Sequence, residues 1–250
     1  TLYRDGNVVS NSDIQTLGVG AYNYTAIIPD DTNKTGSSKT FFLAVNKVTP
    51  ALSLLLNGAA NNLTVTYSAQ TNATASESNS GDADVVYDLY RNDAGISNPD
   101  VQTFAASTYT YIYNTSGGAN YTSATISRTL TVNKAATDVK LFLNGIESNS
   151  SQTYGTNSNA TATLNVSGRT FQLYRNGTQV ASGTSSISEV LTLAAGYYNY
   201  TVAYAGNENY TGDSQAYFLT ISRATSVLSL LLDGVDSDTS VAANTNVTIN

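Results

Sequence analysis

Leu193-Ala194-Ala195-Gly196-Tyr197-Tyr198-Asn199-Tyr200 decides how this chain is interpreted, because close copies of the stretch occur at 17–24 and 104–111. The second copy has Ser107 in place of the glycine. Two other motifs recur at about the same spacing. One is Leu-Tyr-Arg at 2–4, 89–91 and 173–175, and the other is an apolar run ending in Asn-Gly or Asp-Gly at 54–58, 141–145 and 230–234. A recurrence every ~85 residues predicts an array of like modules. A catalytic site is normally unique in a chain, whereas a repeated module sets length or displays a surface.

The third repeat shows the secondary structure most clearly. Apolar residues alternate with polar ones at 139–143, 160–164 and 198–204, which is the period of a half-buried strand. Asn144-Gly145 and Asn176-Gly177 are typical hairpin turns between such strands. Each repeat therefore reads as about seven short strands, the pattern of a β-sandwich.

The opening stretch resembles the tyrosine corner of immunoglobulin-like domains, in which a Tyr near the start of strand F bonds to upstream backbone. Tyr198 takes the corner position, and Tyr22 and Tyr109 are its equivalents. Tyr200 then stands where antibody domains keep their second Cys. This chain has no Cys and no Trp, so the resemblance is to microbial immunoglobulin-like modules.

The predicted fold is all-β, with tandem immunoglobulin-like sandwiches of about 85–90 residues. Residues 50–135 and 136–224 read as complete repeats, 1–49 as the C-terminal part of one (strands C to G), and 225–250 as an N-terminal part (strands A and B). The links between repeats are a few residues long and contain no Gly. We therefore expect short, stiff linkers and a rod-like array.

The two terminal segments are complementary parts of one module, and two interpretations stay open. The chain lacks Met and opens inside a repeat, which favours an internal piece of a longer array. Alternatively, the C-terminal segment of one subunit completes the N-terminal segment of the next, head to tail, and builds a filament. A half-sandwich exposes an apolar face and open strand edges, which favour pairing with another chain.

Composition excludes several classes of function. The net charge of −7, with only 12% charged residues, argues against nucleic acid and against contact with an anionic membrane surface. No apolar run reaches the ~20 residues needed to span a bilayer. Without Cys or His, no disulfide, thiol nucleophile, imidazole base or Cys/His metal site can form. Arg4, Arg91 and Arg175 recur at the end of strand C, where an Arg lies over the sheet or pairs with a nearby acid. No acid recurs at a fixed strand end, so the chain is not predicted to be an enzyme.

The strongest chemical signal is the Asn-x-Ser/Thr sequon, the acceptor of N-linked glycans. It occurs about twice as often as chance would give in a chain so rich in Asn, Ser and Thr. Several copies are in register between repeats: 33 with 120 and 209, 72 with 159 and 246, and 23 with 199. The predicted glycosylation sites are Asn23, Asn33, Asn62, Asn72, Asn114, Asn120, Asn149, Asn159, Asn165, Asn176, Asn199, Asn209 and Asn246. The competing interpretation is an Asn/Thr-rich strand surface without sugar.

Acidic clusters offer the remaining candidates for ligand binding. Asp30-Asp31, Asp82/Asp84/Asp88 and Asp233/Asp236/Asp238 carry the oxygen ligands that Ca²⁺ prefers. They are not equivalent between repeats and none has the spacing of an EF-hand, so solvated loops are the favoured interpretation. No cofactor is predicted apart from N-linked glycans.

The whole chain resembles the tandem immunoglobulin-like repeats of large, sequon-rich archaeal or bacterial cell-surface proteins. The phrases at 173–177, 198–202 and 206–211 carry this resemblance. It implies an extracellular or cell-surface location, glycosylation and a structural role as a stalk or filament whose partner is another copy of itself. The alternative it implies is an adhesin, whose repeats present a binding region outside this chain to a cell-surface or carbohydrate ligand. An accessory carbohydrate-binding module of a secreted enzyme is the third hypothesis.

Overall fold

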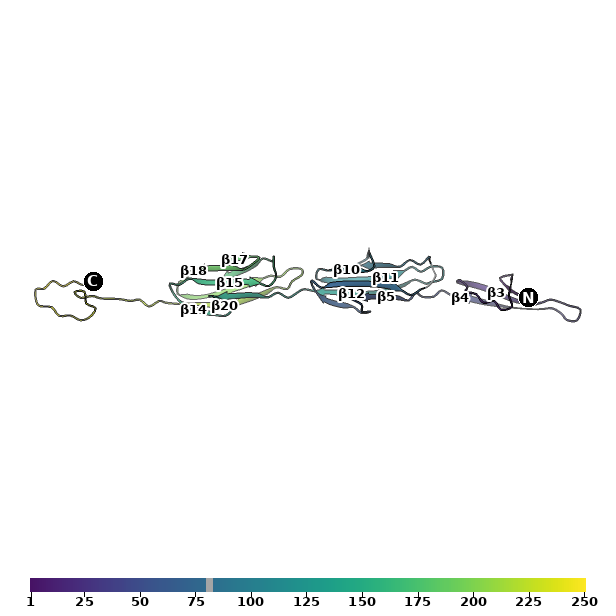
Figure 1. Ribbon diagram of the computed structural model, residues 1–250, viewed down its shortest axis with the longest axis horizontal. Coiled ribbons are helices and arrows are strands. Elements are labelled where there is room, and N and C mark those ends of the chain that lie inside the picture. Colours follow the sequence, from purple (N-terminus) through teal and green to yellow (C-terminus); the bar gives the residue numbers. More distant parts are fainter. Residues whose placement is uncertain (80–82) are drawn as a thin grey trace. The chain divides into compact units, whose positions relative to one another are not determined.

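The computed structural model describes residues 1–79 and 83–250, and all twenty elements in these ranges, β1 to β20, are strands. The chain divides into two compact units, Thr1–Ala135 and Ala136–Asn250. Figure 1 shows two layers of strands in the second and third repeats. Each unit holds one such two-layered sandwich.

The third repeat is a sandwich of a three-stranded and a five-stranded sheet. The first sheet has the order β13 (Val139–Leu143), β15 (Ser158–Leu164), β18 (Ile187–Leu191). The second has the order β14 (Ser150–Thr153), β20 (Asp213–Ser222), β19 (Gly196–Tyr204), β16 (Phe171–Arg175), β17 (Thr178–Gly183). β14 pairs parallel with β20, and the other pairs are antiparallel.

The second repeat has the same topology. Its smaller sheet has the order β10 (Asp100–Thr103), β7 (Gln70–Glu77), β5 (Leu52–Leu56). Its larger sheet has the order β6 (Leu63–Thr66), β12 (Ala124–Asn133), β11 (Ser107–Thr115), β8 (Asp88–Arg91), β9 (Ala94–Ile96). Two sheets joined in this order define an immunoglobulin-like sandwich. The predicted all-β fold of tandem immunoglobulin-like repeats is therefore confirmed.

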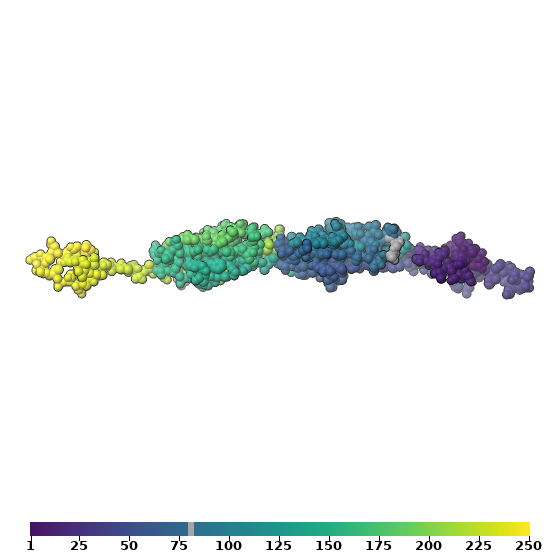
Figure 2. All heavy atoms as spheres, viewed as in Figure 1, coloured from purple at the N-terminus to yellow at the C-terminus, as the bar shows by residue number. Residues whose placement is uncertain are grey.

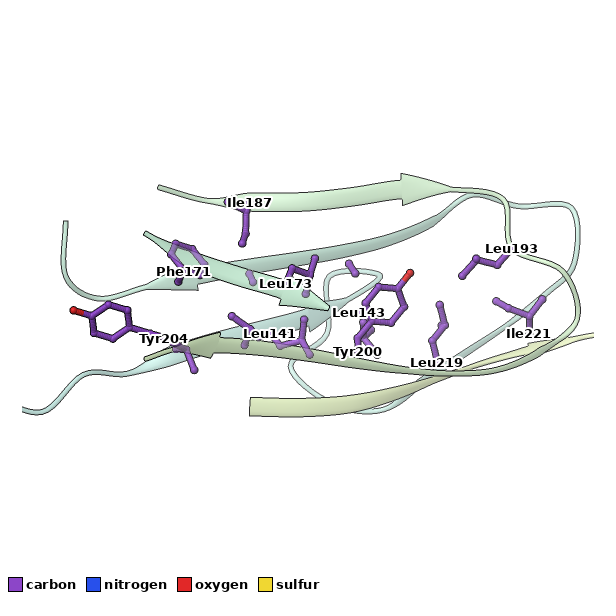
Figure 3. Packing of buried hydrophobic residues seen from close by; sticks show 14 residues of the cluster. Leu141, Leu143, Phe171, Leu173, Ile187, Leu193, Tyr200, Tyr204, Leu219 and Ile221 are labelled. Carbon is purple, nitrogen blue, oxygen red and sulfur yellow. The ribbon is translucent and has the colours of Figure 1, made fainter. Parts of the chain in front are cut away.

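The core of each sandwich is built from the alternate, inward-facing residues of both sheets. In the third repeat, Leu141, Leu173 and Tyr200 are completely buried. Figure 3 shows side chains of β13, β16, β19 and β20 converging in the space between the sheets. Burying apolar side chains stabilises a fold by ~1.5–3 kcal/mol each, so this cluster is the main source of the module's stability.

The Asn-Gly turns fix strand register as well as chain direction. Asn144 has a positive φ of 53°, and its side-chain oxygen accepts the backbone N–H of Asn159 at 2.9 Å. Asn176, with φ 48°, accepts the N–H of Asn199 in the same way at 2.8 Å. Asn and Asp tolerate this left-handed conformation better than other residues with side chains. Each turn residue therefore bends the chain and also holds the strand beside it.

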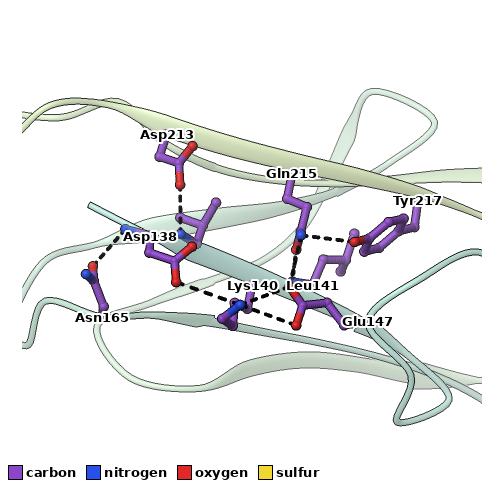
Figure 4. Close-up of polar contacts among 9 residues, drawn as sticks. Asp138, Lys140, Leu141, Glu147, Asn165, Asp213, Gln215 and Tyr217 are labelled. Carbon is purple, nitrogen blue, oxygen red and sulfur yellow. Dashed lines mark hydrogen bonds and ion pairs between the residues drawn. The ribbon is translucent and has the colours of Figure 1, made fainter. Parts of the chain in front are cut away.

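Strand β13 lies at an open edge of its sheet, and side chains from β20 cover part of its backbone. The N–H of Val139 donates to Asp213 at 2.9 Å, and the N–H of Leu141 donates to Gln215 at 2.5 Å. Figure 4 shows these bonds joining the two sheets along one side. Satisfied edge groups cannot template pairing with another chain.

Residues 1–49 form a single sheet with the order β2 (Asn7–Val9), β1 (Leu2–Arg4), β3 (Gly20–Ile28), β4 (Ser37–Val45). Leu43 pairs with Tyr22 as Leu219 pairs with Tyr198, so the two leucines are equivalent. Leu219 is 1% exposed, whereas Leu43 is 44% exposed. The face that lies inside a complete sandwich is therefore uncovered in this segment.

Residues 225–250 differ from expectation. The two strands predicted there, A and B, do not form, and isolated bridges join Leu232 to Val235 and to Ile249. The turn is nevertheless retained: Asp233 has φ 51° and accepts the N–H of Thr248 at 2.7 Å. Figure 2 shows the yellow-green start of this segment as a thin thread of chain. A two-stranded hairpin without a second layer is marginal in water, which explains the missing strands.

Candidate functional site: buried ion pairs, sequons and the module junction

Three tyrosines make the bond that defines a tyrosine corner. The hydroxyls of Tyr22, Tyr109 and Tyr198 donate to the backbone carbonyl four residues upstream, at 2.8, 3.0 and 3.0 Å respectively. The corner ties the connection that precedes strand F to the strand itself. It sets the position of the next tyrosine two residues along, which points into the core.

That inward tyrosine belongs to a polar cluster that links the two sheets. In the third repeat, the Tyr200 hydroxyl donates to Glu189 at 2.7 Å, and Arg175 pairs with the same carboxylate at 2.7 Å. Glu189 lies on β18 of the smaller sheet, whereas the other two residues lie on the larger one. A charged, hydrogen-bonded cluster therefore links the two sheets.

The same cluster recurs in the other repeats. In the second, Tyr111 donates to Asp100 at 2.7 Å, and Arg91 forms an ion pair with that carboxylate. In the first, the members are Arg4, Asp13 and Tyr24. The repeated arginines were predicted to lie over the sheet or to pair with a nearby acid, and the acids were not identified. The structure shows the pairing. The acid always lies 11 residues before the tyrosine, and this spacing is the signal that could have found it.

In the second repeat, burial and the hydrogen bonds of the cluster shift the pKa values of Asp100 and Tyr111. Burial alone would raise the pKa of Asp100, but hydrogen bonds from Gln102, Tyr111 and Arg91 outweigh it, so the pKa of this carboxyl is lowered. Burial and the bond to Asp100 raise the pKa of the Tyr111 hydroxyl. At neutral pH the carboxylate is therefore charged and the phenol neutral, as their hydrogen bond requires.

We expect the second repeat to lose stability at both extremes of pH. A lowered folded-state pKa means that the contribution of Asp100 is present above the ordinary carboxyl pKa and is lost as pH falls through the folded value. The raised pKa of Tyr111 means that its contribution is lost as pH rises past the ordinary range. Urea midpoints of the chain and of Asp100→Asn, followed by near-ultraviolet circular dichroism, should converge in acid. A constant difference down to strongly acid pH would contradict this assignment.

The predicted glycosylation sites fall into classes of different accessibility. Asn209 is buried, at 7% exposure. Asn23, Asn114 and Asn120 are half-buried. The exposed sequon asparagines are Asn33, Asn62, Asn72, Asn149, Asn159, Asn165, Asn176, Asn199 and Asn246.

Three of the sequons on strands share a local geometry. The hydroxyl of Thr74 donates to the side-chain oxygen of Asn72 at 3.1 Å, and Thr161 donates to Asn159 at 3.0 Å. The half-buried Asn23 receives the same bond from its own sequon threonine at 3.0 Å. In each case the oxygen is engaged, while the Nδ2 atom, to which a glycan is attached, makes no hydrogen bond within the described residues.

Other sequons use the asparagine oxygen to hold neighbouring backbone. Asn62 accepts the N–H of Thr129 and Asn149 accepts that of Phe218, both at 2.9 Å. These bonds fasten the strand after each sequon to the last strand of its module. The sequence alone showed neither the equivalence of these two asparagines nor their structural role.

One or two members of each acidic cluster accept backbone hydrogen bonds in loops or turns. Asp31 accepts the N–H groups of Asn33 and Lys34, and Asp84 accepts the N–H of Ala119. Asp233 caps the turn already described. Asp82 lies outside the described residues. Within residues 1–79 and 83–250, no group of three or more acidic, His or Cys side chains is arranged to hold a metal ion.

The first unit contains a junction between two modules. Val48, in the linker, forms a parallel bridge with Tyr121 in the loop between β11 and β12, which we call the F–G loop. Its N–H donates to the carbonyl of Asn120 at 3.0 Å, and its carbonyl accepts from Thr122 at 2.9 Å. The linker is therefore joined to the following module by an isolated β-bridge with two backbone hydrogen bonds.

Two side chains complete this junction. Asn120 accepts the N–H of Val19, in the turn before the tyrosine corner, at 2.9 Å. Lys47 donates to the carbonyl of Gly118 at 2.8 Å. Five hydrogen bonds fasten the two modules here, counting the linker pair, these two bonds and the bond between Thr122 and Thr49.

No family model and no curated protein matches the chain. Among solved structures, it is similar to the fibronectin(III)-like modules of CbhA from Clostridium thermocellum, with 12% identity over 68% of this chain and 94% of that one and a TM-score of 0.30. It is also similar to the I9–I11 tandem of titin (14% identity, 83% and 75% covered, TM-score 0.30). Domains 1–6 of the surface layer protein SbsC are a third match (13% identity, 92% and 36% covered, TM-score 0.32). Likeness at this level concerns the fold and assigns no activity.

Among the described residues, no helix is long and apolar enough to cross a membrane.

Proposed function

We propose that this chain is a structural, N-glycosylated array of immunoglobulin-like modules that serves as an extracellular stalk or filament. The observation that carries the proposal is the junction in the first unit, where the linker and the F–G loop bond to each other. A linker paired in this way holds two modules at a fixed relation, as a length-setting array requires. The recurring acids, Asp13, Asp100 and Glu189, form ion pairs with arginines of their own modules, which supports a non-catalytic role.

Glycans would solve a physical problem of such an array. Only 12% of the residues are charged, so repulsion between neighbouring chains is weak. Strand edges and exposed apolar side chains, among them Val190 and Phe218, would then favour sideways association. Sugars on exposed sequons such as Asn72 and Asn159 would keep the arrays apart.

Glycopeptide mass spectrometry of native material tests this assignment. We expect glycans on Asn72, Asn159 and Asn176 and none on the buried Asn209. The chain offers a matched control, because Asn92 occupies the same exposed turn as Asn176 but is followed by Asp-Ala and is no sequon. Unmodified peptides at both Asn72 and Asn159 would remove glycosylation from the proposal.

The finer form of the proposal is that the segments 1–49 and 225–250 complete one another between subunits. Leu230 is equivalent to Leu141, yet Leu230 is 56% exposed and Leu141 is 0% exposed. Leu43 is uncovered on the opposite half of the module. The turn at Asp233 is already formed, and on joining, the residues on either side of it would form the strand pair that the N-terminal sheet lacks. Joining the halves would bury both apolar sets in one sandwich.

A further inference from the structure

The third repeat has a hollow of about 520 Å³ at the end where its last strand leaves the sandwich. It lies between the turn before the tyrosine corner and the segment that follows β20. The lining residues are Tyr154, Ala194, Ala195, Arg223, Ala224, Thr225 and Ser226. None of these residues belongs to the polar cluster or to a sequon.

Register relates this hollow to the junction of the first unit. Counted from the corner tyrosines, Ala195 is equivalent to Val19. Counted from the paired leucines of the last strands, Arg223 and Ala224 are equivalent to Lys47 and Val48. In the first unit these three positions contact the F–G loop of the following module.

The bonding groups of that contact are available in the hollow. Val19 and Val48 donate their N–H groups to Asn120 in the first unit. Within the described residues, the N–H groups of Ala195 and Ala224 donate to no partner. Arg223 provides a cation where Lys47 donates to a loop carbonyl. The hollow therefore offers the same kinds of donor that hold the F–G loop in the first-unit junction.

The chain carries a matching loop at its other end. In the loop at 30–35, the N–H of Asp31 donates to the carbonyl of Lys34 at 3.0 Å, as Gly118 does to Tyr121 at 3.1 Å. Asn33 is equivalent to Asn120 and is exposed. Asp31 also holds the N–H of Asn33 at 2.7 Å, so the loop is already folded.

We propose that the hollow of one chain binds the Asn33 loop of a second copy. The side-chain oxygen of Asn33 would accept the N–H of Ala195, as Asn120 accepts that of Val19. Asp30 and Asp31 would lie on the side of Arg223, which brings opposite charges together across the contact. This inference rests on the proposed head-to-tail assembly and names the contact that aligns it. It also gives the Asn33 and Asn120 sequons a docking role, because a glycan on either asparagine would occupy the junction.

Engineered cysteines test the contact in the full chain, which has none of its own. Asn33→Cys and Ala195→Cys are made in separate chains, mixed and mildly oxidised. We expect a covalent dimer to form at least ~10-fold faster than between Asn33→Cys and Thr178→Cys, an exposed position at the start of β17, since docking raises the effective concentration. Both sites of the test pair are exposed, so folding should be preserved.

The chain offers an internal positive control. Val19→Cys with Asn120→Cys in one chain should close an intramolecular disulfide across the existing junction. The docking proposal is wrong if this control pair closes while Asn33→Cys cross-links no faster with Ala195→Cys than with Thr178→Cys. Sedimentation of the Cys-free chain distinguishes the docking contact from the proposed function. If the chain assembles but the preferred cross-link does not form, the proposed function stands and only this contact is ruled out.

Discussion

Asp100→Ala is expected to destabilise the second module by about 3 kcal/mol, the low end of the range for deleting one partner of a buried ion pair. The carboxylate is 8% exposed and its partner Arg91 is 23% exposed, so the arginine left behind keeps partial access to water. The change also leaves the buried hydroxyl of Tyr111 without its acceptor. Urea-dependent hydrogen exchange of peptides from 50–135 would measure the loss separately from the other repeats.

A matched control uses the neighbouring acid on β8. Asp88 is exposed and has no ion pair among the described residues, so Asp88→Ala should change the module's stability by less than ~0.5 kcal/mol. Equal losses in the two variants would mean that the cluster contributes no more than general surface charge. The cluster would then make no specific contribution to holding the two sheets together.

Replacing the whole cluster should behave differently from breaking it. Arg91→Met, Asp100→Leu and Tyr111→Phe together remove every charge and hydroxyl at once. Well-packed apolar substitutes for a buried ion pair are often neutral or stabilising, because no charge is left buried without a partner. If the triple variant keeps its stability while Asp100→Ala loses much of it, the loss comes from leaving the Arg91 guanidinium and the Tyr111 hydroxyl without a partner.

Most of the fold was predictable because its signals are local and repeated. The alternation at 139–143 and 198–204, the Asn-Gly turns and the tyrosine at 198 each specify a strand, a hairpin or a corner through neighbouring residues only. Three copies in one chain also aligned the repeats without any other sequence. The immunoglobulin-like sandwich fold of the second and third repeats followed from these features, whereas the order of the strands in each sheet came from the structure.

The polar cluster was only half predictable. Its arginine lies 9 residues before the acid in the first two repeats but 14 before it in the third, because the segment between β16 and β18 is longer there. A fixed spacing from the arginine therefore does not exist. The acid keeps its distance from Tyr200 and its equivalents because the corner fixes the path between them.

Accessibility and stability of isolated segments were not predictable from pattern. Asn33 and Asn209 share a motif and a loop type, yet one is exposed and the other buried, since burial depends on what packs around the loop. The strands expected in 225–250 have the right alternation but no second layer, and alternation alone does not hold a strand in water.

Leu141→Ala is expected to destabilise the third module by about 2–5 kcal/mol, because the side chain is 0% exposed and its removal leaves a cavity. Leu230→Ala makes the same change at the equivalent position of the C-terminal segment, where the side chain is 56% exposed. In dilute solution this variant should lie within ~0.5 kcal/mol of the unaltered chain. Hydrogen exchange of peptides from 136–224 and 225–250 measures both effects in one experiment.

Comparing Leu141→Ala and Leu230→Ala at different protein concentrations tests whether the chain assembles. If 225–250 completes the sheet of 1–49 in another subunit, Leu230 enters a core like that of Leu141, and Leu230→Ala should weaken assembly by a similar free energy. Assembly is then linked to folding, so the exchange of peptides from 225–250 must slow as concentration rises. Concentration-independent exchange, with Leu141→Ala still strongly destabilising, would show that the exposed leucine joins no core between copies of this chain.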